Sequence, residues 1–150
     1  MAANITNKKY ELLEHPAELR FRIYGKTLGE LFINAALALA ETLRQDAKEI
    51  FKNPKPKTKN LKLKAKSIDI NSLLVDFLSE ILAKSQINKC IYLVPKIRVS
   101  IVNSQKSKVV ADLVGYPVDH FNEDIKAVTY QDLNIQKIDG IWQTILVFDI

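Results

Sequence analysis

Alternating apolar and polar residues mark strands near both ends of the chain. Leu19, Phe21 and Ile23 alternate with arginine and tyrosine side chains, the pattern of a strand with one buried face, and Gly25 ends it. From Ile141 to Phe148, by contrast, both alternating faces are largely apolar. A strand with that pattern is central in its sheet and covered on both sides.

Two further segments carry apolar residues at three- and four-residue steps, the period of an amphipathic helix. We expect the first helix over residues 28–45, with Thr27 and Glu30 forming a capping box at its start. The second helix is expected to begin at a cap formed by Asn71 or Ser72. Its apolar stripe consists of Leu73, Leu74, Phe77, Leu78, Ile81 and Leu82.

The remaining apolar segments predict strands joined by turns. These are expected at residues 10–14, 61–66, 90–94, 96–102, 108–114, 124–137 and 141–149. Asp139 and Gly140 are typical of a hairpin turn and would join the last two strands. The order of helices and strands predicts a single α+β domain over residues 1–150: a two-layer sandwich, with a mostly antiparallel sheet and two helices packed on one face.

The composition is that of a soluble globular protein. The 150 residues are 47% hydrophobic, and no stretch approaches the apolar length that a membrane helix needs. The first residues lack the apolar core of a signal peptide, so we expect a cytoplasmic protein. Cys90 is the only cysteine and cannot form an internal disulfide. It lies in an apolar run and is interpreted as a packed thiol, the alternative being a catalytic pair with His15 or His120.

Lysines are concentrated in one stretch of a mildly basic chain. Basic residues outnumber acidic ones by 22 to 17, which gives a formal net charge of +5. The stretch from Lys52 to Lys66 is rich in lysine and interrupted by Pro54 and Pro56. It fits a solvated loop that runs into a strand with a polar face. Direct RNA binding is the alternative, although no aromatic side chain in the stretch is available to stack on bases.

No residue constellation typical of an enzyme occurs, so we expect a protein without catalytic activity of its own. The four glycines are scattered, which excludes a phosphate-cradling loop, and neither G-x-S-x-G nor H-E-x-x-H is present. His15 lies beside Glu14 and three residues before Glu18. This histidine suits an acid/base group or a metal neighbour, and equally the commoner turn histidine bonded to a carboxylate.

The chain ends on two negative charges at the edge of an apolar strand, the side chain of Asp149 and the α-carboxylate of Ile150. Burying an unpaired charge costs several kcal/mol or forces its protonation, so adjacent anions require a cation or a cluster of donors. The alternative is a strand that simply emerges into solvent. Both interpretations remain open on this feature alone.

Three segments together resemble the archease family. They are YELLEHPAELRFRIYGKTLGELFINAALAL at residues 10–39, KAVTYQDL at residues 126–133 and VFDI at residues 147–150. Archeases open on a strand, an E-H-T-A-D turn and a second strand ending in Y-G. They carry K-A-V-T-Y before a closing hairpin and finish on an acidic residue and a small aliphatic one. The order and spacing of these segments cover nearly the whole chain.

The resemblance implies a metal-binding activator of an RtcB-type RNA ligase, acting in tRNA splicing or RNA repair. Archeases help that ligase become guanylylated and turn over repeatedly, so contact with tRNA would be indirect. Carried over, the family's metal site corresponds to Glu18, Asp149 and Ile150. Its oxygen ligands suit Ca²⁺, with Mg²⁺ or Mn²⁺ as alternatives. Lys126 of K-A-V-T-Y is a candidate contact for the ligase or a nucleotide phosphate, or else an ordinary solvent-facing lysine.

Three positions depart from the family pattern. The family's threonine is Pro16, which lacks a hydroxyl and a backbone donor; its aspartate is Glu18; and Gln131 stands where many members have histidine. A second role proposed for archease-like proteins is a chaperone that keeps a tRNA methyltransferase soluble and specific. The acidic C-terminus separates the two roles, because activation should need it whereas a chaperone should need exposed apolar surface.

Overall fold

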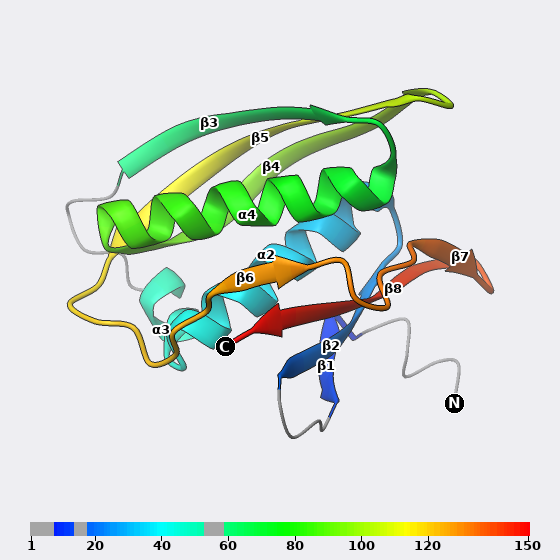
Figure 1. Cartoon of the computed structure of the whole chain (residues 1–150). Coiled ribbons are helices and arrows are strands. Elements are labelled where there is room, and N and C mark those ends of the chain that lie inside the picture. The colour runs from blue at the N-terminus through cyan, green and yellow to red at the C-terminus, as the bar shows by residue number, and fades with distance from the viewer. Residues whose placement is uncertain (1–7, 14–17, 53–58) are drawn as a thin grey trace.

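The computed structural model describes residues 8–13, 18–52 and 59–150, and its elements follow the expected mixture of strands and helices (Figure 1). The strands are β1 (Tyr10–Leu13), β2 (Leu19–Gly25), β3 (Lys59–Ser67), β4 (Cys90–Asn103), β5 (Lys106–Pro117), β6 (Ala127–Thr129), β7 (Gln136–Ile138) and β8 (Ile141–Asp149). The helices are α2 (Leu28–Leu43), α3 (Ala47–Lys52) and α4 (Ile70–Asn88). The predicted α+β class is confirmed.

The strands divide between two antiparallel sheets. The first has the order β1-β2-β8-β6, with β7 also paired to β8, and the second has the order β3-β5-β4. Helices α2 and α4 lie between the sheets, because each contacts strands of both (Figure 1). Both helices were predicted to pack on one face of a single sheet; they lie instead between two sheets.

The start of α2 confirms the predicted capping box. The Thr27 hydroxyl accepts a hydrogen bond from the Glu30 amide at 3.0 Å, and the Glu30 carboxylate accepts one from the Lys26 amide at 3.2 Å. This arrangement satisfies amides that have no partner within the helix.

The predicted cap of the second long helix is wrong by two to three residues. Asp69 is the N-cap of α4, and its carboxylate accepts a hydrogen bond from the Ser72 amide at 2.7 Å. The side chain of Asn71 makes a tertiary contact instead, accepting from the Ile135 amide at 2.8 Å. A local pattern could not reveal that contact, because its two residues are 64 positions apart.

Three of the predicted strands differ from the structure. Residues 90–94 and 96–102 form one strand, β4, whose register shifts between Leu93 and Lys96. Proline is tolerated at such a bulge because no amide is needed there, and Pro95 lies within it. Residues 124–137 were expected as one strand, but they form only β6 and β7, with an irregular connection between them.

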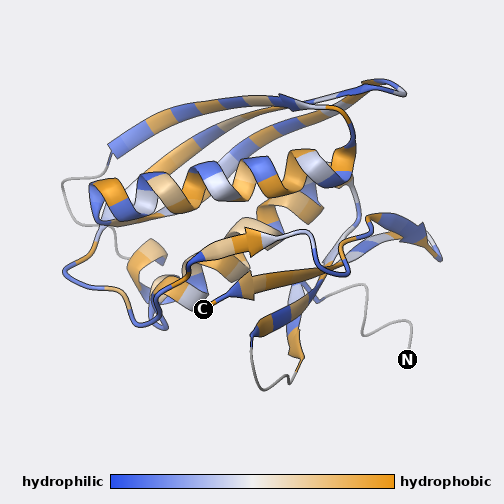
Figure 2. Cartoon of the chain, viewed as in Figure 1, coloured by the Kyte–Doolittle hydropathy of each residue, from blue (hydrophilic) through white to orange (hydrophobic). Residues whose placement is uncertain are grey.

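The last hairpin agrees with prediction. Asp139 and Gly140 have φ angles of 51° and 79°, as a two-residue turn with a left-handed backbone requires. Strand β8 is central, with β2 on one side and β6 and β7 on the other. Leu146, Val147 and Phe148 are completely buried, and apolar residues dominate β8 in Figure 2.

The core also contains the single thiol. Cys90 is buried, and burial raises the pKa of its thiol, in agreement with the interpretation as a packed residue. His120 is exposed and pairs with Asp119 at 2.8 Å. His15 and Pro16 lie outside the described residues, as do Pro54, Lys55, Pro56 and Lys57. No described helix is long and apolar enough to span a membrane.

Candidate functional site

The predicted site residues lie at one end of the first sheet. Leu19 of β2 pairs with Phe148 of the antiparallel strand β8. Glu18 precedes Leu19 and Asp149 follows Phe148, so both lie just past this last residue pair, at the same end of the two strands. Asp149 also pairs with Ala127 of β6. Three strand ends therefore meet where the sequence analysis placed the cation site.

Lys126 reaches this strand end through its backbone. Its amide donates a hydrogen bond to the Asp149 carbonyl oxygen at 2.7 Å. The side chain of Lys126 is exposed and lies one residue before β6. The structure thus places Lys126 beside the C-terminus, with its ammonium group accessible from solvent.

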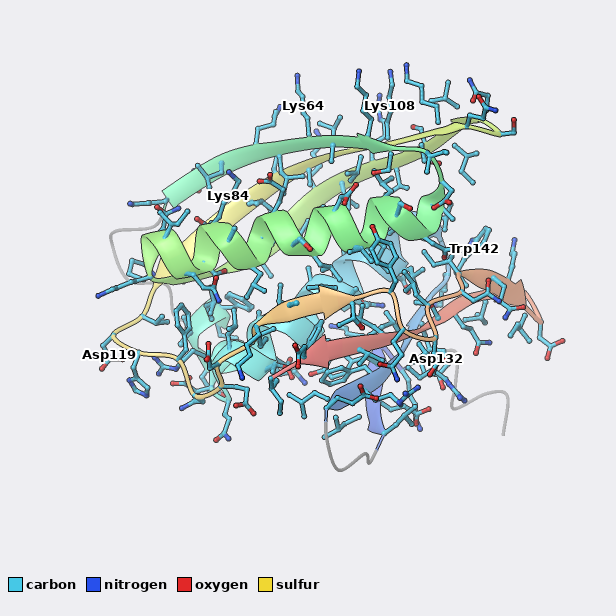
Figure 3. All side chains as sticks on the ribbon, in the orientation of Figure 1. Lys64, Lys84, Lys108, Asp119, Asp132 and Trp142 are labelled. Carbon is cyan, nitrogen blue, oxygen red and sulfur yellow. The ribbon has the colours of Figure 1, made fainter. Side chains whose placement is uncertain are left out.

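Arg20 connects the strand end to the connection that follows β6. Its guanidinium donates to the Glu18 carboxylate at 2.9 Å and to the Asp132 carboxylate at 2.6 Å. Figure 3 shows Asp132 beside the first sheet. Hydrogen bonds to Asp132 and then to Glu18 raise the pKa of Arg20 above its ordinary value. Arg20 thereby places one positive charge between the two carboxylates.

Gln131 completes this group. Its side-chain amide nitrogen donates to Glu18 Oε2 at 3.1 Å, and its side-chain oxygen accepts from Arg20 Nη2 at 3.3 Å. This orientation of the amide places its donor beside an acceptor and its acceptor beside a donor. The Gln131 backbone amide also donates to the Thr129 hydroxyl at 3.3 Å. A neutral amide therefore bridges Glu18 and Arg20.

Side chains from other elements hold the connection that carries Gln131 and Asp132. The Asn134 amide donates to the Thr144 hydroxyl at 3.0 Å, and the Ile135 amide donates to the Asn71 side chain at 2.8 Å. Asp132 has a positive φ of 55°, which short polar residues tolerate better than most. These side chains accept hydrogen bonds from amides that would have paired with a neighbouring strand if residues 124–137 had formed the predicted strand.

A hard cation at this site would have to compete with Arg20. The described residues contain no group of three histidine, cysteine, aspartate or glutamate side chains placed to hold a metal. Ligands would therefore have to include the α-carboxylate or a carbonyl oxygen at Ile150 besides Asp149 and Glu18. A cation held by Glu18, Asp149 and Ile150 therefore stays a prediction.

Neither Arg20 nor Asp132 was predicted from the sequence as a member of this site. Arg20 stands at an ordinary polar position of an alternating strand, and Asp132 is one of many exposed acidic residues. They are 112 positions apart, so no local pattern joins them. Two local signals were available: Arg20 lies two residues after Glu18, on the same face of an alternating strand, and Asp132 lies next to Gln131 in a segment already singled out.

Comparisons with known proteins agree on one family. The model of the "Archease protein family (MTH1598/TM1083)" matches residues 10–150. The protein archease of Methanosarcina acetivorans is 35% identical over 149 residues, covering 95% of this chain and 97% of that protein. The protein archease of Pyrococcus abyssi is 32% identical, covering 95% and 99%.

Two solved structures share the fold. The solution structure of Methanobacterium thermoautotrophicum protein 1598 has a TM-score of 0.77 and 23% identity, covering 95% of this chain and 99% of that one. The crystal structure of an archease, possible chaperone, from Thermotoga maritima has a TM-score of 0.61 and 17% identity, covering 92% and 94%.

Proposed function

Because this chain belongs to the archease protein family, we propose that it is a cytoplasmic, metal-binding activator of an RtcB-type RNA ligase. In this role it promotes guanylylation of the ligase and its repeated turnover in tRNA splicing or RNA repair; activation itself needs no direct contact with tRNA. The observation that carries the proposal is the convergence of Glu18, Asp149 and Lys126 at one end of the first sheet.

The chain itself would take no part in the covalent chemistry. Its single thiol is buried, and the raised pKa of Cys90 opposes formation of the reactive thiolate. Activation would instead come from positioning: a rigid strand end can orient a loop or a phosphate of the partner and so lower a barrier. The exposed ammonium of Lys126 is the group we assign to such a phosphate.

We propose Glu18, Asp149 and Ile150 as the residues that hold the cation, with Ca²⁺ as the first candidate and Mg²⁺ or Mn²⁺ as alternatives. Oxygen donors suit all three ions. When bound, the ion supplies positive charge that offsets repulsion between the carboxylates at the strand end. Arg20 already balances Glu18, so binding should be weaker than at a site built only of carboxylates.

A ligase assay tests the proposal. Trace amounts of the intact chain, added to an RtcB-type ligase with GTP and Mn²⁺, should increase both ligase guanylylation and the number of turnovers. Asp149→Ala should lose most of this stimulation and Lys126→Ala part of it. Asp139→Asn, at the other end of β8, is the matched control and should retain it. Equal turnover with the intact chain, with Asp149→Ala and with no added chain would refute activation.

A chaperone for a tRNA methyltransferase is the second candidate, and one surface favours it. Ile68, Ile101 and Val102 are 63%, 57% and 50% exposed, and they lie at the hairpin end of the second sheet. Exposed apolar groups of this kind are what a chaperone would use to hold a partner. The double variant Ile101→Ser and Val102→Ser should abolish protection of a methyltransferase from aggregation but leave ligase activation intact.

A further inference from the structure

The outer face of the second sheet carries a regular array of positive charge. The aligned residues form three rows across β3, β5 and β4: Lys62, Asp112 and Lys96; Lys64, Val110 and Arg98; Lys66, Lys108 and Ser100. We call the six cations of these rows the basic face: Lys62, Lys64, Lys66, Lys96, Arg98 and Lys108. All six are exposed, and Figure 3 shows Lys64 and Lys108 pointing away from the helices.

The bulge at Pro95 brings the cations of β4 onto this face. Before the bulge Leu93 pairs with Val114, and after it Lys96 pairs with Asp112, so β4 contains one extra residue. Because side chains alternate along a strand, an extra residue reverses which ones point outward. Without the bulge Lys96 and Arg98 would point toward the helices. The backbone irregularity therefore assembles charges that are far apart in the sequence.

The basic face accounts for the excess charge of the chain. Asp112 is the only carboxylate in the three rows, and it lies 3.7 Å from Lys62. Apart from the face and Asp112, the sequence has 16 basic and 16 acidic residues, against totals of 22 and 17. The formal net charge of +5 is therefore concentrated on one side of one sheet.

The size of the basic face and its scarcity of apolar residues suit binding to a phosphate backbone. Alternate residues on a strand are about 6.8 Å apart and neighbouring strands about 4.8 Å apart, so the array covers roughly 13 Å by 10 Å. It contains a shallow hollow of about 250 Å³ lined by Lys62, Lys96, Ile97, Arg98, Val110 and Asp112. Protein interfaces are depleted in lysine and have apolar centres, whereas Val110 is the only apolar residue in these rows.

We propose that the basic face binds the phosphate backbone of structured RNA without reading its sequence. The three rows contain no aromatic side chain for base stacking, so the contacts are electrostatic and affinity follows the number of phosphates neutralised. The choice of RNA rests on the proposed function, whereas binding of a phosphate backbone follows from the charges alone. This surface is separate from the strand end of the first sheet, which we assign to activation.

Binding of a labelled tRNA transcript to the full chain, measured by fluorescence anisotropy without ligase, tests the proposal. With six phosphates neutralised, raising salt from 50 to 200 mM should weaken binding roughly 300- to 2,000-fold. The triple variant Lys64→Gln, Arg98→Gln, Lys108→Gln should bind at least about tenfold more weakly at 50 mM, with a salt effect of only about 20- to 40-fold.

The matched control removes three positive charges elsewhere: Lys26→Gln, Lys48→Gln and Lys137→Gln. This variant should keep most of the affinity and the steep salt dependence, and thermal melting should show both triple variants folded. Equal losses in the two variants would mean attraction by net charge alone and would overturn the proposal. Displacement of tRNA by polyglutamate of equal charge as readily as by unlabelled tRNA would identify a surface for acidic proteins, with the same consequence.

Discussion

The contact between Asn71 and Ile135 should stabilise the connection that carries the site. The Ile135 amide belongs to a buried residue, and its partner is the Asn71 side chain at 2.8 Å. Asn71→Ala removes the acceptor and leaves that amide without a partner. A buried unsatisfied group costs about 1–3 kcal/mol. Alanine has the better helix propensity by up to about 0.7 kcal/mol, so the net loss of unfolding free energy should lie between about 0.3 and 3 kcal/mol.

Asn71→Asp provides the matched control. It keeps an oxygen acceptor of the same shape, and a negative charge in the first turn of α4 interacts favourably with the helix dipole. Its unfolding free energy should therefore equal or exceed that of the wild type. Urea unfolding measures all three proteins, and an unchanged m-value would show that the change lies in stability rather than in compactness.

Amide hydrogen exchange locates the effect. In Asn71→Ala the Ile135 amide should lose protection, and neighbouring amides of the connection that carries Asp132 should follow. Amides of β5, in the other sheet, should exchange as in the wild type apart from the global loss of stability. Wild-type stability together with a fully protected Ile135 amide in Asn71→Ala would refute the assigned role of this contact.

Three other results are expected. Calorimetric titration with Ca²⁺ should show one site in the intact chain and none in Asp149→Ala; equal binding by both would place any ion elsewhere. Arg20→Gln should bind Ca²⁺ more tightly than the wild type, because it removes the cation that competes for Glu18, and weaker binding would contradict that competition. Burial raises the pKa of Tyr24 and, to about 12, that of Tyr92. The stability that these two neutral tyrosines contribute should thus be fully present below pH 10.0, the ordinary pKa of tyrosine, and should fall as the pH rises above it. The loss should be at most about 1.4 kcal/mol per pH unit for each tyrosine, and denaturant unfolding between pH 9 and 11 would measure it.

Local patterns predicted the elements whose causes are local. The capping box at Thr27, the turn at Asp139 and the buried strand β8 each depend on neighbouring residues, and each is confirmed. The division into two sheets depends on pairings such as β2 with β8, whose strands lie at opposite ends of the chain. Alternation shows which face of a strand is buried, but it does not show which strand lies beside it.

The site shows the same limit. Glu18, Asp149, Ile150 and Lys126 were predicted because terminal and motif positions are visible in the sequence, and their role stays a prediction. Arg20, however, also pairs with Asp132, through a contact that only the fold creates. The basic face likewise depends on a bulge in β4, where the sequence offered only a proline between two apparent strands.

The most direct test of the central claim is a change at the C-terminus that leaves every side chain in place. Adding three glycine or serine residues after Ile150 moves the α-carboxylate away from the strand end while Asp149 and Lys126 remain. Ligase turnovers should then be counted with trace amounts of the extended and the native chain, after thermal melting has shown equal stability. The account predicts that the extended chain loses most of its stimulation of the ligase; stimulation equal to that of the native chain would contradict it.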